Sequence, residues 1–281
     1  MRQRWIELGD FLRTRRGRAV PTVATHGGRR QVPGMRREEL AVLAGLSPAY
    51  YTRLEQGRAP NVSDQVLTAV CRALSLDAAE RNHVWRLARP APATESAGSD
   101  ETLRPQLRML LDALSPAPAL VLGRDRHLLA WNRTAHAIHA PHLDPTVVDD
   151  PATRPWWPEL LFCDERVGAL FLDWESKARD TVADLRGELG RRPEGDRLAA
   201  LTGDLRVRSG PFAELWAEYP ITACAHHDRV YKHPVVGLLE LHDEFLELSD
   251  DPSQRLALFA AVPASPSARA IEQLANLSTI G

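Results

Sequence analysis

Lysine, cysteine and long apolar runs are scarce in this chain of 281 residues. Among its 35 basic side chains, only Lys177 and Lys232 are not arginine. The three cysteines, Cys71, Cys163 and Cys224, are odd in number and form no CxxC pair, which is typical of reduced thiols in a cytosol. No apolar run approaches the roughly 20 residues of a membrane span, and no signal-peptide core follows the N-terminus. We therefore expect a soluble cytoplasmic protein with no membrane partner.

Catalytic motifs are absent as well. The sequence contains no nucleophile elbow, Walker loop, GxGxxG or HExxH pattern, so we expect no enzyme activity and no cofactor. His136, His139 and His142 form an HxxHxxH series, and helical spacing would place the first two on one face, as a metal site requires. Pro141 should end that helix before His142, however, and no cysteine or carboxylate joins the series at ligand spacing. We therefore expect surface histidines and no metal site.

Charge divides the chain into two parts. Residues 1–90 contain 16 arginines and 8 acidic residues, a net charge of +8, whereas the other residues contain 19 basic and 29 acidic side chains, a net charge of −10. A basic first third indicates a polyanionic partner for that part of the chain. Residues 90–102 contain only Pro, Ala, Ser, Thr, Gly and acidic residues, which is linker composition. The sequence therefore predicts two domains, 1–89 and 103–281, each with its own core.

The stretch 35–58, MRREELAVLAGLSPAYYTRLEQGR, predicts two short helices joined by a turn. Apolar residues spaced i, i+3 and i+4 give the first helix one buried face, and Gly45 can end it in a left-handed conformation. Ser47 can cap the second helix, which then begins with a proline. Tyr51 and Leu54 share the inner face of this second helix. The layout is that of a helix-turn-helix, although an ordinary helical hairpin is commoner in proteins at large.

Four side chains of the second helix, Ala49, Tyr50, Thr52 and Arg53, point away from its inner face. Because a helix fits the DNA major groove, this outer face is the candidate for contact with base edges. Arg53 can form two hydrogen bonds to a guanine or a plain phosphate contact, and Thr52 or Tyr50 can contact a thymine methyl group or a phosphate. Tyr50 can instead be an exposed aromatic that packs on the next helix. The basic charge of the domain favours DNA over the plain hairpin.

Three further helices complete the predicted first domain. Trp5, Leu8 and Leu12 form an apolar stripe near the N-terminus. Ser63 can cap a later helix, and Asp77 begins an acidic capping box for the last one. The first domain is therefore expected to be a compact all-α domain of five helices.

Four arginines that precede the helices of the motif are candidates for phosphate contacts. Arg29 and Arg30 lie in the long loop 17–35, which either brings positive charge to the DNA backbone or is merely a solvated surface loop. Arg36 and Arg37 precede the first helix of the motif, where the positive partial charge of a helix N-terminus makes a cation slightly unfavourable.

The phrase LAGLSPAYYTRLEQGR, within the five-helix pattern, resembles the XRE (lambda-repressor-like) helix-turn-helix family. The family signature runs small residue, Gly, apolar residue and Ser, followed by a helix that closes on apolar-Glu-x-Gly. The resemblance implies that Ser47 and Arg58 contact phosphate, and that Glu55 has a structural role as a brace for a nearby cation or backbone N–H. The residues predicted to contact DNA are Arg29, Arg30, Arg36, Arg37, Ser47, Ala49, Tyr50, Thr52, Arg53 and Arg58.

The second domain mixes helical and strand patterns. Two short apolar runs separated by a polar turn predict a hairpin, and later alternating runs predict more strands. This order of elements predicts an α+β domain with one antiparallel sheet flanked by helices. The expected helices are 105–114, 133–138, several within 156–219, and 267–277, and the expected strands are 119–123, 127–131 and others within 230–264.

The phrases PALVLGRDRHLLAWN, FLDWESKARDTVADLR, HPVVGLLELHDEFLEL and DDPSQRLALFAAVPASPSA resemble the ligand-binding domain of the MmyB-like transcription regulators. Together with the first domain, the resemblance covers nearly the whole chain, except that residues 139–158 and 220–230 follow no phrase of the family. It implies a PAS-like sensor domain, in a family with one member known to bind a fatty acid. Large aromatic side chains suit an apolar cavity, although for any single tryptophan core packing is the commoner explanation. The predicted ligand-binding residues are Trp131, Asn132, Trp157, Phe162, Trp174 and Trp216.

Together these patterns predict a bacterial one-component transcription regulator of α+β fold. We expect the first domain to bind double-stranded operator DNA and the second to bind a small apolar ligand, such as a fatty acid. A homodimer and a pseudo-palindromic operator are expected, because paired recognition helices about one DNA turn apart match two half-sites. The alternatives are a ligand-independent DNA-binding protein whose second domain only dimerises, and an enzyme with an accessory DNA-binding domain.

Overall fold

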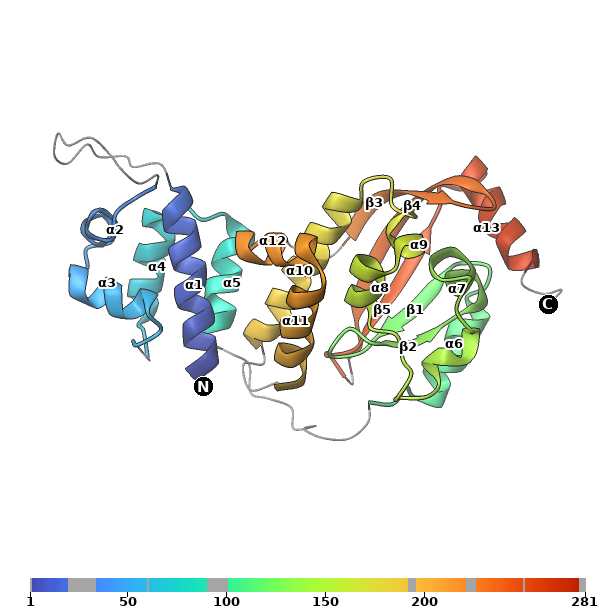
Figure 1. Cartoon of the computed structure of the whole chain (residues 1–281), viewed down its shortest axis with the longest axis horizontal. Coiled ribbons are helices and arrows are strands. Elements are labelled where there is room, and N and C mark those ends of the chain that lie inside the picture. Colours follow the sequence, from blue (N-terminus) through green and yellow to red (C-terminus); the bar gives the residue numbers. More distant parts are fainter. Residues whose placement is uncertain are drawn as a thin grey trace. The chain divides into compact units, whose positions relative to one another are not determined.

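The computed structural model of the chain divides into two compact units (Figure 1). Unit 1 consists of Met1–Glu95, Val182–Thr202 and Trp216–Ala223, and unit 2 consists of Ser96–Thr181, Gly203–Leu215 and Cys224–Gly281. The residues that the structure describes are 2–19, 34–59, 61–89, 101–191, 196–220, 226–249 and 251–277. Most of the predicted linker, and the loop arginines Arg29 and Arg30, therefore lie outside the described residues.

Unit 1 is helical in its described part. Three helices that follow later in the chain, α10 (Trp174–Arg191), α11 (Asp196–Arg208) and α12 (Gly210–Glu218), contribute residues to both units. The N-terminal third supplies the other helices of the unit, which are α1 (Arg2–Arg18), α2 (Arg37–Leu43), α3 (Pro48–Glu55), α4 (Asp64–Ala73) and α5 (Ala78–Ala88).

Local sequence explains where several of these helices begin. The Ser47 hydroxyl accepts a hydrogen bond from the Tyr50 backbone N–H at 3.2 Å, and a proline fills the first position of α3. Asp77 and Glu80 form the predicted capping box of α5, with hydrogen bonds of 2.8 and 3.0 Å between each carboxylate and the other residue's N–H. Because these caps are local, the sequence predicted them correctly.

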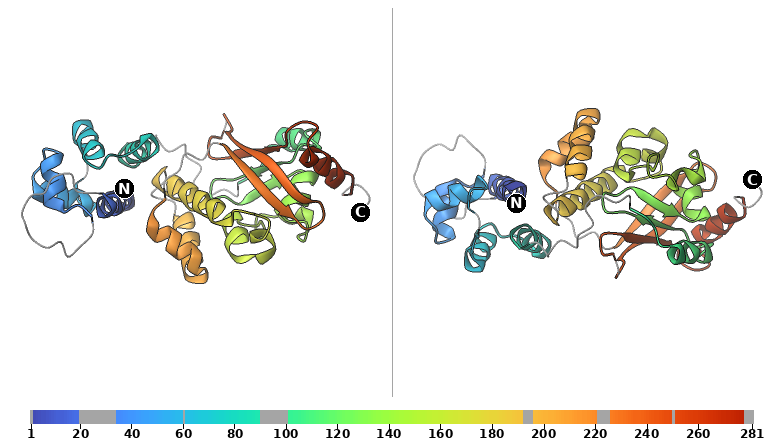
Figure 2. Two further views of the ribbon diagram at one scale, coloured as in Figure 1. Left: turned by 90° about the horizontal axis from the view of Figure 1, so that it is seen from above. Right: turned by 90° about the horizontal axis from the view of Figure 1, so that it is seen from below.

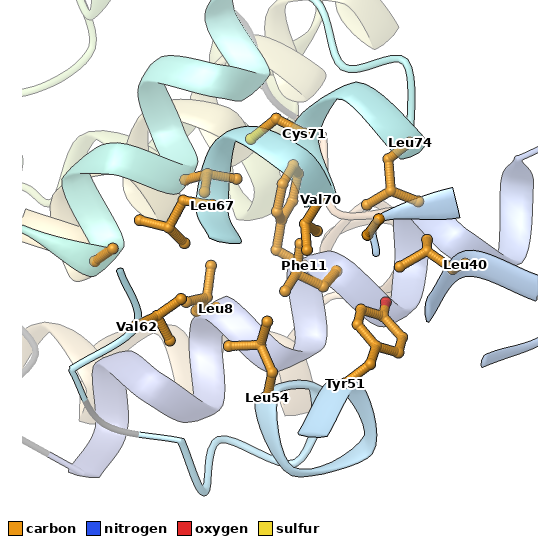
Figure 3. Packing of buried hydrophobic residues seen from close by; sticks show 14 of the residues in the cluster. Leu8, Phe11, Leu40, Tyr51, Leu54, Val62, Leu67, Val70, Cys71 and Leu74 are labelled. Atoms are coloured by element: carbon orange, nitrogen blue, oxygen red, sulfur yellow. The ribbon is translucent and has the colours of Figure 1, made fainter. Parts of the chain in front are cut away.

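One apolar core holds the helices of unit 1 together (Figure 3). Leu8 and Phe11 of α1 are fully buried, and they face Tyr51 and Leu54 of α3, which are 0% and 1% exposed. Leu40 of α2 packs beside Tyr51. Full burial of such a side chain stabilises the fold by about 1.5–3 kcal/mol. The inner face of α3 therefore fixes this helix to the domain, as predicted.

Five antiparallel strands form the sheet of unit 2, in the order β2-β1-β5-β4-β3. Since neighbouring side chains of a strand point to opposite faces, the sheet has an apolar core on each face. Leu120 and Leu239 belong to the larger core, whereas Val121 and Leu129 belong to the smaller one. The strands are β1 (Ala119–Leu122), β2 (Leu128–Trp131), β3 (His226–His233), β4 (Gly237–Glu247) and β5 (Arg255–Ala260).

Helices cover both faces of this sheet (Figure 2). Leu107 and Leu111 of α6 (Pro105–Ala113) pack into the smaller core. The larger core receives side chains from the 3₁₀-helix η1 (Pro145–Val148) and from the helices α7 (Arg133–His139), α8 (Trp157–Cys163), α9 (Glu165–Gly168) and α13 (Pro266–Leu277).

The predicted fold class is confirmed. The first third of the chain is helical, and the later part contains an antiparallel sheet flanked by helices. Within the described ranges, no helix has the length and apolar character needed to cross a bilayer.

Candidate nucleic-acid interface and ligand-domain residues

The outer face of α3 carries the four side chains predicted to contact bases. Ala49 and Arg53 are exposed, and Tyr50 and Thr52 are half-buried. The guanidinium carbon of Arg53 lies 5.9 Å from the centre of the Tyr50 ring, so these two side chains lie together on the surface. Two hydroxyl groups and one guanidinium give this face hydrogen-bonding groups that suit base edges and phosphates.

Two glycines bring α3 close to α1. Gly57, just after α3, has a φ of +69°, and a Cβ at this position would lie 2.8 Å from the carbonyl carbon of Trp5. On α1, a Cβ at Gly9 would overlap the carbonyl oxygen of Glu55. Gly45, in the turn before α3, has a similar φ of +67°, but an added Cβ there would meet no atom within 4 Å. Gly45 therefore serves the turn, whereas Gly9 and Gly57 serve the contact between the two helices.

A buried carboxylate links α1, α2 and α3. Glu55 is 1% exposed, and it accepts hydrogen bonds from Arg16 at 2.8 and 2.9 Å and from Arg37 at 2.9 and 3.1 Å. Arg13 Nε lies 3.6 Å from the same carboxylate. Burial acts to raise the pKa of Glu55, but the hydrogen bonds from Arg16 and Arg37 outweigh burial, so this pKa lies below its ordinary value. The predicted brace is therefore an ion-pair network that holds three helices together.

The residues predicted to contact phosphate differ in the partners they already have. Arg37 uses Nε and Nη2 to bind Glu55, so its first role is within the domain. Two glutamates in the first turn of α2 offset the unfavourable arginine charge at that helix N-terminus. Arg36, Ser47 and Arg58 are exposed, whereas Arg29 and Arg30 lie outside the described residues.

The predicted ligand-binding residues lie in several separate places. Trp131 Nε1 donates to the Pro145 carbonyl oxygen at 2.8 Å. Trp157 packs in the larger core, and the rings of Phe162 and Trp174 lie 5.4 Å apart, centre to centre. Trp216 belongs to unit 1, unlike the others.

The buried side chain of Asn132 has a structural role, because its amide forms hydrogen bonds with backbone groups. Its Oδ1 accepts hydrogen bonds from the N–H groups of Ala119 at 3.1 Å and Ala135 at 2.9 Å. Its Nδ2 donates to the carbonyl oxygens of Leu111 at 3.2 Å and Ala117 at 2.7 Å. This amide therefore joins α6, β1 and α7, because all its main hydrogen-bonding positions are satisfied by backbone groups.

A buried cluster of charged side chains in unit 2 was missed by the sequence analysis. Asp243 of β4 is fully buried, with Lys177 Nζ 4.0 Å and Arg229 Nε 3.3 Å from its Oδ2. The Tyr231 hydroxyl donates to Asp243 at 3.2 Å, and Arg229 also pairs with Asp180. Burial raises the pKa of Asp243. The available signal was the alternation of β4, which places Asp243 on the same face as Leu239 and Leu241.

Aromatic rings surround the lysine of this cluster. Lys177 Nζ lies 5.5 Å from the ring centres of Trp157 and Phe171 and 5.7 Å from that of Phe245. Such rings stabilise an ammonium group through their electron-rich faces. The lysine is therefore held by a carboxylate and by aromatic rings in the interior of unit 2.

The prediction that the histidine series lies on the surface was wrong for His139. His139 is 2% exposed, because α7 turns it into the larger core, where its ring contacts Trp157, Tyr231 and Phe259. Its Nδ1 bonds the Ala135 carbonyl oxygen at 3.0 Å, and burial lowers its pKa to about 4. Among the residues with described positions, no group of three His, Cys, Asp or Glu side chains is arranged to hold a metal ion.

Comparison with known families gives two matches. Residues 103–274 match the family described as the MmyB-like transcription regulator ligand binding domain. Residues 7–84 match a family described as a helix-turn-helix domain, and this range contains the α2–α3 pair. A search of curated protein sequences gave no significant match.

Proposed function

Because this chain belongs to the family of MmyB-like transcription regulators, we propose that it is a one-component regulator. It combines a helix-turn-helix DNA-binding domain with a ligand-binding domain, and neither matched family is an enzyme family. In this proposal the N-terminal domain binds a specific operator, and the C-terminal domain responds to a small apolar molecule. As ranges of sequence, the proposed domains are 1–89 and 103–281 with the linker 90–102 between them, although residues 182–202 and 216–223 of the second range belong to unit 1.

The observation that carries the DNA-binding proposal is the division of α3 into two faces. Tyr51 and Leu54 are buried, whereas Arg53 is exposed with Tyr50 beside it. The glycine contacts and the Glu55 network fix this helix against α1 without using its outer face. A rigidly held helix with a polar outer face suits the major groove, where each base pair shows a distinct pattern of donors and acceptors.

Each candidate residue then has a specific role. Arg53 binds a guanine edge, and Tyr50 and Thr52 contact a thymine methyl group or a phosphate. Ala49 allows close approach to the groove. The remaining residues, Arg29, Arg30, Arg36, Ser47 and Arg58, contact the phosphate backbone, while Arg37 joins them only through groups that its bond to Glu55 leaves available.

A homodimer is the proposed assembly, with a pseudo-palindromic operator. Two identical recognition helices related by a two-fold axis match two half-sites about one DNA turn apart. A second copy thus doubles the contacts that one α3 makes.

The ligand is proposed to be a small apolar molecule, with fatty acids as the first class to test. Of the predicted ligand-binding residues, Trp131, Trp157, Phe162 and Trp174 of unit 2 remain proposed for this ligand. Asn132 is not retained because backbone groups satisfy its hydrogen-bonding positions, and Trp216 is not retained because it belongs to unit 1. For regulation, the ligand must bind the DNA-competent and the incompetent state with different affinity, because equal affinity shifts no population.

The decisive experiment sequences the DNA fragments that the purified full-length protein selects from a random pool, with and without lipid extract. Enrichment of one motif supports the regulator, and a change in its enrichment with extract supports the sensor. Thermal unfolding with a panel of saturated fatty acids measures ligand binding separately, since a bound ligand raises the melting temperature. A selected motif without stabilisation by any panel member would favour a ligand-independent protein whose second domain only dimerises.

A further inference from the structure

A buried polar cluster within unit 1 contains residues from both family matches. Glu7 belongs to α1, in the helix-turn-helix match, whereas Arg186 of α10 and Tyr219 belong to the ligand-binding match. All three lie in unit 1. Arg186 is 7% and Tyr219 2% exposed, so this part of the ligand-binding match is buried together with DNA-binding helices.

The Arg186 guanidinium is the centre of the cluster. Its carbon lies 4.1 Å from the ring centre of Trp216 and 3.6 Å from that of Tyr219. Arg186 Nη1 lies 3.2 Å from a Glu7 carboxylate oxygen, and Nη2 donates to the Trp216 carbonyl oxygen at 2.5 Å. The Tyr219 hydroxyl donates to the same Glu7 carboxylate at 3.1 Å. Buried charge-assisted bonds of this kind are strong and directional, so they define the position of α1.

Tyr219 is also part of the hydrophobic core of the helix-turn-helix helices. Its ring lies 5.5 Å from that of Phe11 and 5.9 Å from that of His83, and Phe11 and His83 are 5.2 Å apart. Its carbonyl oxygen accepts a hydrogen bond from Arg15 Nη2 at 3.3 Å. Tyr219 therefore contacts both α1 and α5.

The backbone at Tyr219 is strained. Its φ is +54°, in the left-handed region that bulky side chains rarely adopt. Such a conformation in a bulky residue persists only where surrounding contacts enforce it. The contacts with Glu7, Phe11 and Arg15 supply that enforcement.

Helix geometry connects this cluster to the recognition helix. Trp5 and Gly9 are four residues apart, on one face of α1, and both lie against residues at the end of α3. Glu7, halfway between them, is turned about 200° away from each at 100° per residue. One side of α1 thus seats α3, and the other side is held by Arg186 and Tyr219.

We propose that Arg186 and Tyr219 are positioning residues for DNA binding, supplied by the ligand-binding part of the chain. These two residues hold α1 in position, and α1 in turn supports α3. The affinity for the operator therefore depends on the contacts that Arg186 and Tyr219 make with α1. The inference rests on the proposed function, and it adds a route by which the ligand-binding part reaches the recognition helix.

The test uses full-length Arg186→Met and Tyr219→Phe variants. Arg186→Met removes the charge but keeps an unbranched apolar stem, and Tyr219→Phe removes only the hydroxyl. Arg179→Met is the matched control, because Arg179 lies on the same helix and pairs with Glu175 at its exposed surface. Two quantities are measured at a temperature at which each protein is folded: hydrogen exchange of α1 amides, and affinity for the DNA motif that the wild type selects.

We expect both variants to lose about tenfold of the α1 exchange protection. Their affinity for the motif should change by about fivefold or more, while the control matches the wild type in both measurements. If Arg186→Met does not fold, Tyr219→Phe alone decides. Lost protection with unchanged DNA affinity would show a purely structural contact and overturn the proposal, as would changed affinity with unchanged protection. Failure of the proposed function looks different, since the wild type itself would then select no motif.

Discussion

At the residue scale, Arg53 is the side chain whose removal should affect DNA recognition and little else. It is exposed at the end of α3 and is stacked only loosely near Tyr50. Arg53→Ala should weaken binding to the selected motif by about 1–3 kcal/mol and relax the preference at one base position. Titrations against the motif and its single-base variants measure both effects, with Arg72→Ala on the exposed side of α4 as the control. Unchanged specific binding would falsify the assignment of this outer face.

Replacing Glu55 should first lower the stability of the folded protein, and affect DNA binding only after that. Glu55→Gln removes the charge that pairs with Arg16 and Arg37, and we expect a loss of about 2–4 kcal/mol in the free energy of unfolding. Because the folded-state pKa is lowered, the stabilisation is complete above the ordinary pKa of 4.5 and is lost as the pH falls through the folded value. Urea unfolding at several pH values should therefore show acid sensitivity below about pH 4.5 in the wild type that is reduced in the variant. Equal acid sensitivity in both proteins would contradict this account of the network.

His139 should also make the protein less stable as the pH falls, but in a higher pH range than Glu55. The unfolded chain takes up a proton near pH 6.5, whereas buried His139 stays neutral down to a pKa of about 4. The wild type should lose about 1.4 kcal/mol per pH unit through this residue as the pH falls across that window. His139→Phe keeps the aromatic packing and should show a slope smaller by this amount in unfolding measured between pH 6.5 and 4.5. An unchanged slope would mean that His139 is protonated in the folded protein.

At the scale of elements, the close packing of α3 against α1 depends on Gly57, because glycine has no Cβ atom. Both Gly57 and Gly45 have positive φ, so alanine at either position costs about 1–2 kcal/mol in backbone strain. Only at Gly57 does the added methyl group also collide with backbone, at Trp5. Gly57→Ala should therefore destabilise the chain more than Gly45→Ala and also weaken operator binding, as measured by thermal unfolding and DNA titration. Equal losses from the two variants would show that the close contact with α1 is unimportant.

The elements also show what a sequence can predict. The Ser47 cap and the Asp77–Glu80 capping box depend on neighbours within three residues, so pattern alone found them. The inner face of α3 followed from helical spacing in the same way. The partners of Glu55 come from 18 and 39 residues away, and a single sequence offers no signal to identify them.

Burial of polar side chains was the main source of error. His139 was placed on the surface because histidine is polar, but α7 packs it among aromatic rings. Asp243 was overlooked although strand alternation placed it inside, since its lysine and arginine partners come from distant elements. In both cases the contacts that bury a polar side chain come from distant parts of the sequence, and the sequence pattern alone did not identify them.

At the scale of the whole molecule, the positive charge of the first third of the chain should strengthen binding to DNA of any base sequence. Residues 1–90 have a net charge of +8, and Arg29 and Arg30 contribute two of its positive charges. A double Arg29→Ala, Arg30→Ala variant should weaken binding to selected and scrambled DNA alike, and lower the slope of log affinity against log salt by about one for each phosphate that is no longer neutralised. Titrations at several salt concentrations measure this slope. A loss confined to the selected motif would instead make these arginines base-reading residues.

The place of Tyr219 in the core around Phe11 has a consequence for evolution and engineering. A chimeric regulator could be made by joining the DNA-binding half of one protein to the sensor of another at the linker. Here such a chimera would bring a foreign residue against Phe11, and a foreign side chain against Glu7. Functional exchange would then require that α1 and the α10–α12 region be inherited together, so these distant stretches of sequence should change in concert among relatives.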